Sequence, residues 1–254
     1  MSLRSSNSIA DDDYPGSRGF PFKLAIIGGG PSGCSVIVRA VRTGYIERLC
    51  GADKESQLSG VCIIDQCSLD RFGGGRLQDY SINSNTFAVK FASNVLDDKQ
   101  ESLPPELCTG SYFEKLKTSE NCKLLYEYGN KQGSLQVVGG FLHDVGTSVV
   151  ETLAQYPATS RCLTDTTLNS AERYVRDDGL TGWKLSISKA GEAPSFIYAK
   201  DVLFATGGRQ ETPILANNAH NCKVLGRLDK RQEELSSPLS FIPYLSVGML
   251  TLTS

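Results

Sequence analysis

The sequence is poor in the residues from which metal centres are built. Only two of its 254 residues are histidines, His143 and His220, and its eight cysteines form no Cys-x-x-Cys pair. Structural zinc sites use four cysteine or histidine ligands, usually in closely spaced pairs. The chain also has no Gly-x-Ser-x-Gly turn, the motif that presents the nucleophile of many serine hydrolases. The sequence therefore predicts neither a bound metal nor a serine hydrolase.

Long apolar runs and an excess of positive charge are missing as well. No stretch reaches the roughly 18 consecutive apolar residues that a membrane span needs, and residues 1–20 are too polar for a secretory signal. The net charge is −2, which gives no electrostatic basis for binding nucleic acid. We expect a cytoplasmic protein with reduced thiols that acts on a small-molecule substrate, without a nucleic-acid or membrane partner. The oligomeric state does not follow from the sequence.

Composition changes along the chain indicate its organisation. Residues 1–21 are rich in Ser, Asp, Gly and Pro and predict a disordered tail. Residues 22–208 predict an α/β domain with a Rossmann-like parallel sheet, interrupted by a helical excursion at about 67–160 and an antiparallel meander at about 181–200. Residues 209–254 form an atypical C-terminal segment without an obvious sheet partner. One interpretation of that segment is a truncated second domain.

The first structured elements predict a strand–helix–strand unit. The apolar run 23–27 is typical of a buried parallel strand, and 34–43 has helical spacing and ends before Gly44. A second buried strand at 61–64 ends at Asp65. Parallel strands joined by a helix make a right-handed crossover unit.

Glycines are abundant, 25 of 254 or about 10% where about 7% is usual, and they cluster where this unit turns. A Gly-x-Gly-x-x-Gly loop lies between the first strand and its helix. In such a loop the first glycine permits the turn, the second lets a pyrophosphate approach the backbone, and the third lets the helix pack closely. The alternative is a structural glycine turn without a nucleotide. The loop consists of Gly28, Gly29, Gly30, Pro31, Ser32 and Gly33.

Asp65 is the acid expected at the end of the second strand, where a carboxylate accepts hydrogen bonds from ribose hydroxyls. It follows Gly33 by 32 residues rather than the usual ~20, and an exposed insertion at 46–60 accounts for the excess. A carboxylate at this place repels a 2′-phosphate and so disfavours NADP. An ordinary loop aspartate is the alternative.

The rest of the chain predicts further helices and strands. Helices are expected at 111–128 and at 144–155, the second with Asp144 as its N-cap. Extended segments are expected at 163–175, 183–188, 195–199 and 201–205.

Three segments together resemble the flavoproteins with two dinucleotide-binding domains, in particular the FAD/NAD(P)-binding oxidoreductases related to the lysine and ornithine N-hydroxylases. The first is Ile26–Gly33. The second is Phe72–Asn85, which is similar to the segment beside the flavin in those proteins. The third is Asp201–Gly208, which is similar to the strand that ends in Ala-Thr-Gly and returns to the cofactor.

The resemblance implies FAD as the cofactor and a set of residues that contact it. For Gly75, Arg76 and Asn83 a surface loop is the alternative, and for Thr206 and Gly207 it is a plain strand end. No catalytic residue can be named. The implied cofactor-binding residues are Gly28, Gly29, Gly30, Pro31, Ser32, Gly33, Asp65, Gly75, Arg76, Asn83, Thr206 and Gly207.

The implied function is that of an FAD-dependent, monooxygenase-like oxidoreductase. NAD(P)H is the expected reductant of such proteins, but no second Gly-x-Gly-x-x-Gly loop for it is evident. A non-catalytic or truncated cofactor-binding protein is therefore one alternative, and an NAD-binding dehydrogenase is another. Cys62 and Cys67 have the spacing of a redox-active pair, but core packing explains Cys62 better. His143 beside Asp144 is interpreted as a helix-entry residue rather than an acid–base couple.

Overall fold

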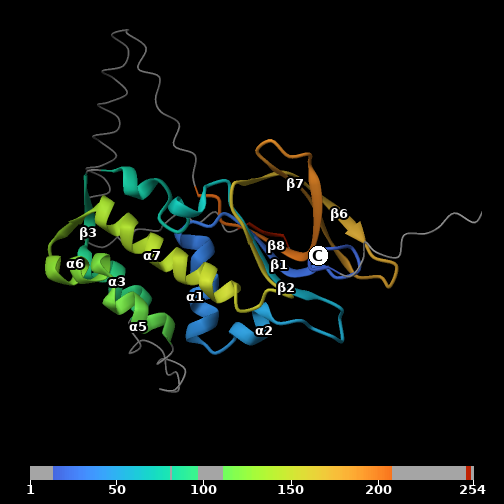
Figure 1. Cartoon of the computed structure of the whole chain (residues 1–254), viewed down its shortest axis with the longest axis horizontal. Helices are drawn as coiled ribbons and strands as arrows, with labels where there is room; N and C mark the ends of the chain where they lie inside the picture. The colour runs from blue at the N-terminus through green and yellow to red at the C-terminus, as the bar shows by residue number, and fades with distance from the viewer. Residues whose placement is uncertain (1–13, 81, 97–110, 208–249, 253–254) are drawn as a thin grey trace, which may run out of the picture. The chain divides into compact units, whose positions relative to one another are not determined.

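The computed structural model describes residues 14–80, 82–96, 111–207 and 250–252 (Figure 1). The described residues up to Thr206, together with 250–252, belong to one compact unit. Its main sheet is built from β1 (Phe22–Ile27), β2 (Ser59–Ile64), β5 (Arg161–Leu163), β6 (Thr166–Val175), β7 (Thr181–Lys189), β8 (Ser195–Phe204) and β9 (Leu250–Leu252). Its helices are α1 (Pro31–Arg42), α2 (Ile46–Cys50), α3 (Ala88–Leu96), α5 (Ser111–Thr118), α6 (Glu120–Tyr128) and α7 (Leu135–Leu153).

The sheet combines a parallel half with an antiparallel meander. Its order is β5-β2-β1-β8-β7-β6, in which β5, β2, β1 and β8 run parallel and β8, β7 and β6 run antiparallel. Strand β8 serves both halves, because its first residues pair with β7 while Ala199–Phe204 pair with β1. The predicted fold class, a Rossmann-like parallel sheet with a crossover helix and a meander, is confirmed.

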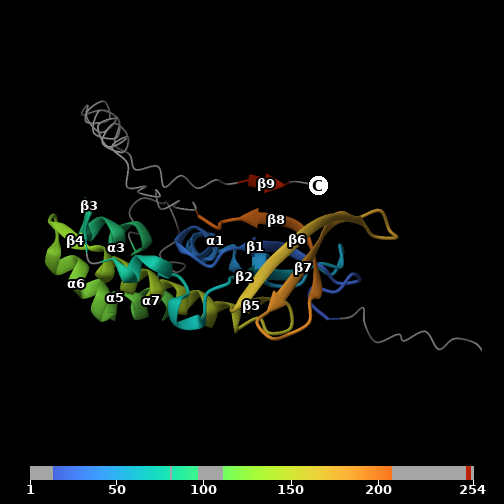
Figure 2. The ribbon, with the colours of Figure 1, turned by 90° about the horizontal axis from the view of Figure 1, so that it is seen from above.

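Two apolar cores lie on opposite faces of the parallel strands, as the alternation of side chains along a strand requires. On one face Ile26, Ile63 and Leu203 pack with α1, α7 and the shorter helices. On the other face the neighbouring positions, such as Ala25 and Cys62, pack with side chains of the meander, which curls back over the sheet (Figure 2). Both faces are therefore covered, which explains why β2 is buried along its whole length.

The helical excursion forms a layer beside α1. It begins with two 3₁₀ turns, η1 (Leu69–Arg71) and η2 (Gly75–Asp79). A two-stranded sheet of β3 (Asn83–Phe87) and β4 (Gln132–Ser134) follows, with α3, α5 and α6 packed around α7. No helix in the described part of the chain is long and apolar enough to cross a membrane.

Several details differ from the sequence predictions. Residues 14–21 are not a loose tail: Ser17 is buried, and the Tyr198 amide donates to the carbonyl of Gly16. Segment 46–60 is only partly exposed, because it contains α2 with the fully buried Cys50.

Two helices and two strands are also bounded differently. The expected helix 111–128 is two helices, α5 and α6. Helix α7 begins at Leu135 with Ser134 as its N-cap, so Asp144 is a mid-helix residue and not a cap. The two strands expected at 195–199 and 201–205 are one strand, β8. Residues 250–252 do have a sheet partner, since β9 pairs with β8; the rest of 209–254 lies outside the described residues.

Candidate functional site

The glycine loop lies at the carboxyl end of β1, between the ends of two parallel neighbours. The Gly28 amide donates to the carbonyl of Ile64 at the end of β2 (2.8 Å), and the Ala205 amide donates to Ile27 (2.7 Å). Ligands of parallel α/β sheets bind beyond the carboxyl ends of the strands. The structure therefore brings the loop, Asp65 and the Ala-Thr-Gly segment to one edge, as the sequence predicted.

Two glycines of the loop are required by the backbone itself. Gly28 has a φ of +110°, and a Cβ there would lie 2.5 Å from the carbonyl oxygen of Ala205. A Cβ on Gly33 would lie 1.9 Å from the carbonyl oxygen of Gly28. The loop can close and α1 can pack against β1 only without these side chains.

The N-terminus of α1 presents unused backbone donors. The first intrahelical bond runs from the Cys34 amide to the carbonyl of Gly30 (2.9 Å), so the amides of Ser32 and Gly33 have no acceptor within α1. Pro31 at the first helical position has no amide hydrogen to lose. No side chain caps this end. Such an end attracts an anion through its free N–H groups and the helix dipole.

Asp65 braces the loop from the end of β2. One carboxylate oxygen accepts the Gly29 amide, and the other accepts the Cys67 amide at 2.6 Å. The carboxylate is thus turned toward the glycine loop, and both of its oxygens already serve the protein backbone. Each oxygen retains a further lone pair, so the expected ribose contact stays a prediction.

Phe72 holds the loop from the other side. Its ring is buried against Gly29, where a Cβ would lie 2.0 Å from the ring. The Gly73 amide donates to the carbonyl of Gly29 (2.9 Å), and the Cys34 thiol lies 3.2 Å from the same oxygen. Together with Asp65, these contacts use both the N–H and the C=O of Gly29. The sequence motifs did not predict this role for Phe72, because its contacts with Gly29 and with α7 join segments that are far apart in the chain.

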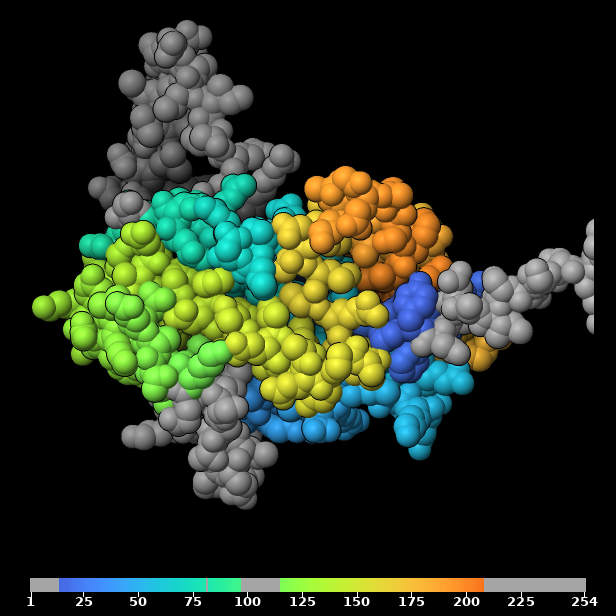
Figure 3. Space-filling view, viewed as in Figure 1, coloured from blue at the N-terminus to red at the C-terminus, as the bar shows by residue number. Residues whose placement is uncertain are grey.

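The glycines that follow Phe72 mainly serve packing. Cβ atoms on Gly73 and Gly74 would lie 2.3 Å from carbonyl oxygens of α7, whereas Gly75 faces open space at a φ of +52°. Figure 3 shows this segment (cyan) lying against α7. Arg76 is exposed, so among the expected flavin contacts of this segment Gly75 and Arg76 are accessible.

Arg71 is paired with a carboxylate, and Asn83 lies away from the glycine loop. Arg71 makes two hydrogen bonds to Asp79, at 2.7 and 2.9 Å, and this pairing lowers the pKa of the Asp79 carboxyl. Asn83 is exposed on β3 and pairs with Ser134 at the start of α7. Gly73, which bonds the glycine loop, contacts α7 at Gly146 instead. Gly146 is twelve residues beyond Ser134, which corresponds to roughly 18 Å along the helix axis. The structure therefore does not gather Asn83 with the residues of the glycine loop.

Thr206 and Gly207 follow the end of β8. The Thr206 nitrogen would lie 3.1 Å from a Cβ on Gly28, so its backbone borders the loop, and its side chain is exposed. Gly207 has a φ of +71°, which explains a glycine by conformation alone.

Buried thiols are not poised for chemistry. Cys34 and Cys62 are almost fully buried, and this burial raises the pKa of both thiols; the same effect raises the pKa of Cys162 to about 12. Cys62 lies in the core on the meander face of the sheet, so its expected packing role agrees with its position. His143 is likewise not at a helix entry but in the middle of α7.

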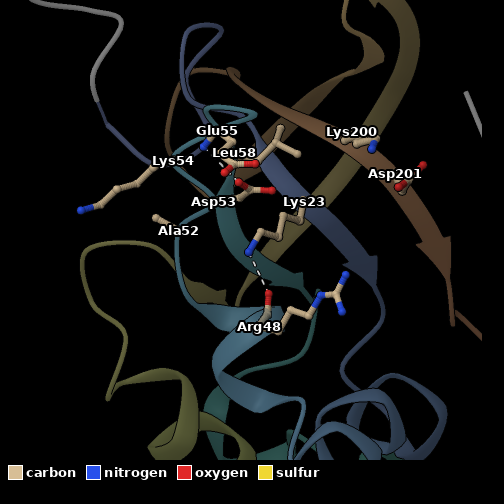
Figure 4. Close-up of a pocket in the computed structure, with 9 residues that line it drawn as sticks. All are labelled: Lys23, Arg48, Ala52, Asp53, Lys54, Glu55, Leu58, Lys200 and Asp201. Atoms are coloured by element: carbon tan, nitrogen blue, oxygen red, sulfur yellow. Dashed lines mark hydrogen bonds between the residues drawn. The ribbon is translucent and has the colours of Figure 1, made fainter.

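Hollows in the described surface include two that are not lined by the glycine loop. One of about 520 Å³ lies near the amino ends of β1 and β2, where charged side chains of both signs surround it (Figure 4). There the Lys23 ammonium donates to the carbonyls of Arg48 and Gly51, at 2.8 and 2.7 Å. The other, of about 750 Å³, lies between η1 and α7. We assign the candidate site to the loop because its backbone donors converge there.

Comparisons with known proteins find several hydroxylases among the similar proteins. No protein-family model matches the chain. A curated relative is CMP-5'-(3-aminopropyl)phosphonate hydroxylase of Streptomyces rubellomurinus, 29% identical over 195 residues, which cover 76% of this chain and 38% of that protein. The solved ornithine hydroxylase of Pseudomonas aeruginosa, in its reduced form, is similar with a TM-score of 0.48 and 13% identity over 78% of this chain and 42% of that one.

A further similar structure is an ornithine N-hydroxylase of Kutzneria sp. 744, solved with reduced FAD, NADP⁺ and L-ornithine. Its TM-score is 0.44, at 12% identity over 74% of this chain and 37% of that one. The chain thus spans about two fifths of the length of these proteins. The proteins to which this chain is similar are thus two ornithine hydroxylases and a hydroxylase of a phosphonate compound.

Proposed function

We propose that this chain is the FAD-binding part of an FAD-dependent, monooxygenase-like oxidoreductase, and that the N-terminus of α1 binds the FAD pyrophosphate. The amides of Ser32 and Gly33 would donate to the phosphate oxygens. Asp65 would hold the loop and accept hydrogen bonds from the ribose hydroxyls. Gly75, Arg76 and Thr206 border the same edge and would face the rest of the cofactor, whose flavin would supply the redox chemistry.

The observation that carries this proposal is the surroundings of Gly30. A Cβ at this position would meet no atom within 4 Å, and its φ of −71° is open to any residue. Other glycines that face open space, namely Gly75, Gly179, Gly191 and Gly207, all have a positive φ that accounts for them. At Gly30 neither packing nor a positive φ requires glycine. The close approach of a ligand to the backbone does.

Electrostatics favour FAD over NADP at this loop. The helix dipole contributes roughly 0.3–1 kcal/mol toward binding an anion at the exposed N-terminus. The first turn of α1 contains no acidic residue, whereas its last turn carries Arg39 and Arg42. Asp65 would repel a 2′-phosphate on the adenosine ribose, which FAD does not have.

The direct test is FAD binding by the wild-type chain and by Gly30→Ala. We expect wild type to quench flavin fluorescence saturably, and Gly30→Ala to remain folded while its affinity for FAD falls at least tenfold. Ser35→Ala, one turn into α1 with an exposed hydroxyl bonded to the Ser32 carbonyl, is the matched control and should bind like wild type. Equal affinity in wild type and Gly30→Ala contradicts the assignment of the site.

Turnover is a separate part of the proposal. We propose an NAD(P)H-reduced, small-molecule-oxidising activity in the cytoplasm for the whole protein; the described cysteines support a reducing compartment, since Cys34, Cys50, Cys62, Cys67, Cys122 and Cys162 are all free. The second candidate is a cofactor-binding protein without turnover, because the sequence has a single Gly-x-Gly-x-x-Gly loop. NAD(P)H oxidation by the FAD-loaded chain favours the first, and bound flavin without oxidation favours the second. Binding of NAD without flavin contradicts both and indicates a dehydrogenase.

A further inference from the structure

We propose that His143 is a positioning residue for the glycine loop, acting through Phe72 and Gly73 on the peptide of Gly29. The inference rests on the proposed function in so far as the loop binds FAD. Its physical content is a chain of three contacts from α7 to the loop. Nothing in the sequence pattern connects these residues, because they come from three distant segments.

The first contact joins α7 to the Phe72 segment. The Nδ1 atom of His143 lies 2.9 Å from the carbonyl oxygen of Phe72. Because a carbonyl can only accept, Nδ1 carries the hydrogen and donates it. The histidine side chain is partly buried, and Phe72 is buried, so this bond is shielded from competing water.

The second contact is the close packing that makes the bond possible. Gly139, His143 and Gly146 recur at i, i+4 and i+7 and therefore share one stripe of α7. Cβ atoms on the two glycines would lie 2.5 Å from the Gln78 nitrogen and 2.7 Å from the Phe72 carbonyl oxygen. The bare backbone at each end of the stripe lets residues 72–78 lie on the helix, and His143 between them holds that segment in register.

The third contact transmits this placement to the loop. The Phe72 ring covers Gly29, and the Gly73 amide donates to the Gly29 carbonyl at 2.9 Å. Asp65 holds the amide of the same residue. With the N–H and the C=O of Gly29 both hydrogen-bonded, the next residues, Gly30 to Gly33, start from a fixed orientation. Loss of the His143 bond would free the segment on one side and lower the fraction of molecules whose loop is ready for the phosphate. Apparent affinity falls by that fraction.

The test compares three variants of the full chain. His143→Leu removes the donor. His143→Asn restores a side-chain amide at the place of Nδ1, and Thr147→Ala alters the same face of α7 one turn later while the Phe72 carbonyl keeps its His143 donor. We expect an FAD dissociation constant about tenfold higher for His143→Leu, the factor that follows when one buried carbonyl loses its donor. His143→Asn and Thr147→Ala should stay within about twofold of wild type.

A second readout needs no cofactor. Hydrogen exchange at the Gly73 amide, measured by NMR in the FAD-free protein, should accelerate about tenfold in His143→Leu and recover in His143→Asn. If His143→Leu does not fold, His143→Gln takes its place, because its amide is one methylene too far for the same bond. Unchanged Gly73 exchange in the donor-free variant overturns the inference, as does an Asn variant no better than Leu. If the wild-type chain does not bind FAD, the proposed function is refuted. The role of His143 is then still decided by the exchange measurement, which needs no FAD.

Discussion

Alanine at Gly33 and at Gly30 should separate the stability of the fold from the binding of its ligand. The two glycines lie three residues apart at the start of α1, Gly30 as the N-cap and Gly33 as a buried residue of the first turn. Their surroundings differ sharply. A Cβ on Gly33 would lie 1.9 Å from the carbonyl oxygen of Gly28 and 3.3 Å from the Ile26 side chain, whereas one on Gly30 would meet nothing within 4 Å.

The cost at Gly33 follows from what it would hit. The obstructing atom is a backbone oxygen held in the turn, so α1 would have to shift away from β1, an overpacking that costs about 1–3 kcal/mol or more. A gain of about 1 kcal/mol for replacing a helical glycine by alanine offsets part of this. We expect a net loss of about 2 kcal/mol, or a melting temperature roughly 4–8 °C lower for a chain of this size. At Gly30 we expect a change within about 0.5 kcal/mol, because alanine is a poorer N-cap but restricts the unfolded chain.

Urea unfolding of the two FAD-free variants, followed by circular dichroism, measures these differences. FAD titrations of the same samples give the other half of the comparison, in which Gly30→Ala should lose affinity without losing stability. The reasoning is refuted if Gly30→Ala is destabilised as much as Gly33→Ala, or if Gly33→Ala unfolds at the wild-type midpoint.

Three further predictions concern the surroundings of the site and the meander. Asp65→Asn should lower the free energy of unfolding by about 1–3 kcal/mol, because the amide offers one acceptor where two backbone N–H groups point; an unchanged urea midpoint would contradict the brace. Gly146→Ala should destabilise by about 1–2 kcal/mol through its clash with the backbone of the Phe72 segment, while Gly140→Ala, whose nearest neighbours are atoms of the Asn121 side chain, should cost less. The hydrogen bond from Arg176 lowers the pKa of Asp178 from 3.8 to about 2. The stabilisation by this pair is therefore complete above about pH 4 and is lost as the pH falls toward 2. In melts at different pH, the stability difference between wild type and Asp178→Asn should narrow over that interval, and a constant difference would refute the pairing.

Local patterns were sufficient for the parts of the fold whose partners are close in sequence. The apolar runs of β1 and β2 and the helical spacing of α1 predicted the crossover unit to within three residues at each boundary, because each element is largely buried or amphipathic in its own sequence. The glycine loop was visible for the same reason. Its motif spans six residues and needs no distant partner to be identified.

Long-range pairing explains the errors. Strand β8 reads as two strands because Lys200 and Asp201 interrupt its apolar residues, yet it is continuous since one end pairs with β7 and the other with β1. Helix α7 reads as starting near Asp144 because glycines and β-branched residues fill its first half. Of those glycines, Gly139 lies against Gln78 and Gly140 against Asn121, and these contacts cannot be seen without the fold.

The same distinction applies within the candidate site. The open helix N-terminus could be inferred from the sequence, but the hydrogen bonds to the N–H and C=O of Gly29 could not. Its N–H is taken by Asp65 from β2, and its C=O is taken by Gly73 from the helical excursion. Both partners belong to the protein, so these two bonds help to set the orientation of the following amides. An anion that binds there therefore need not order the loop, and more of its interaction energy is available as affinity. The glycine-rich turn is in this sense held by residues that lie well outside its motif.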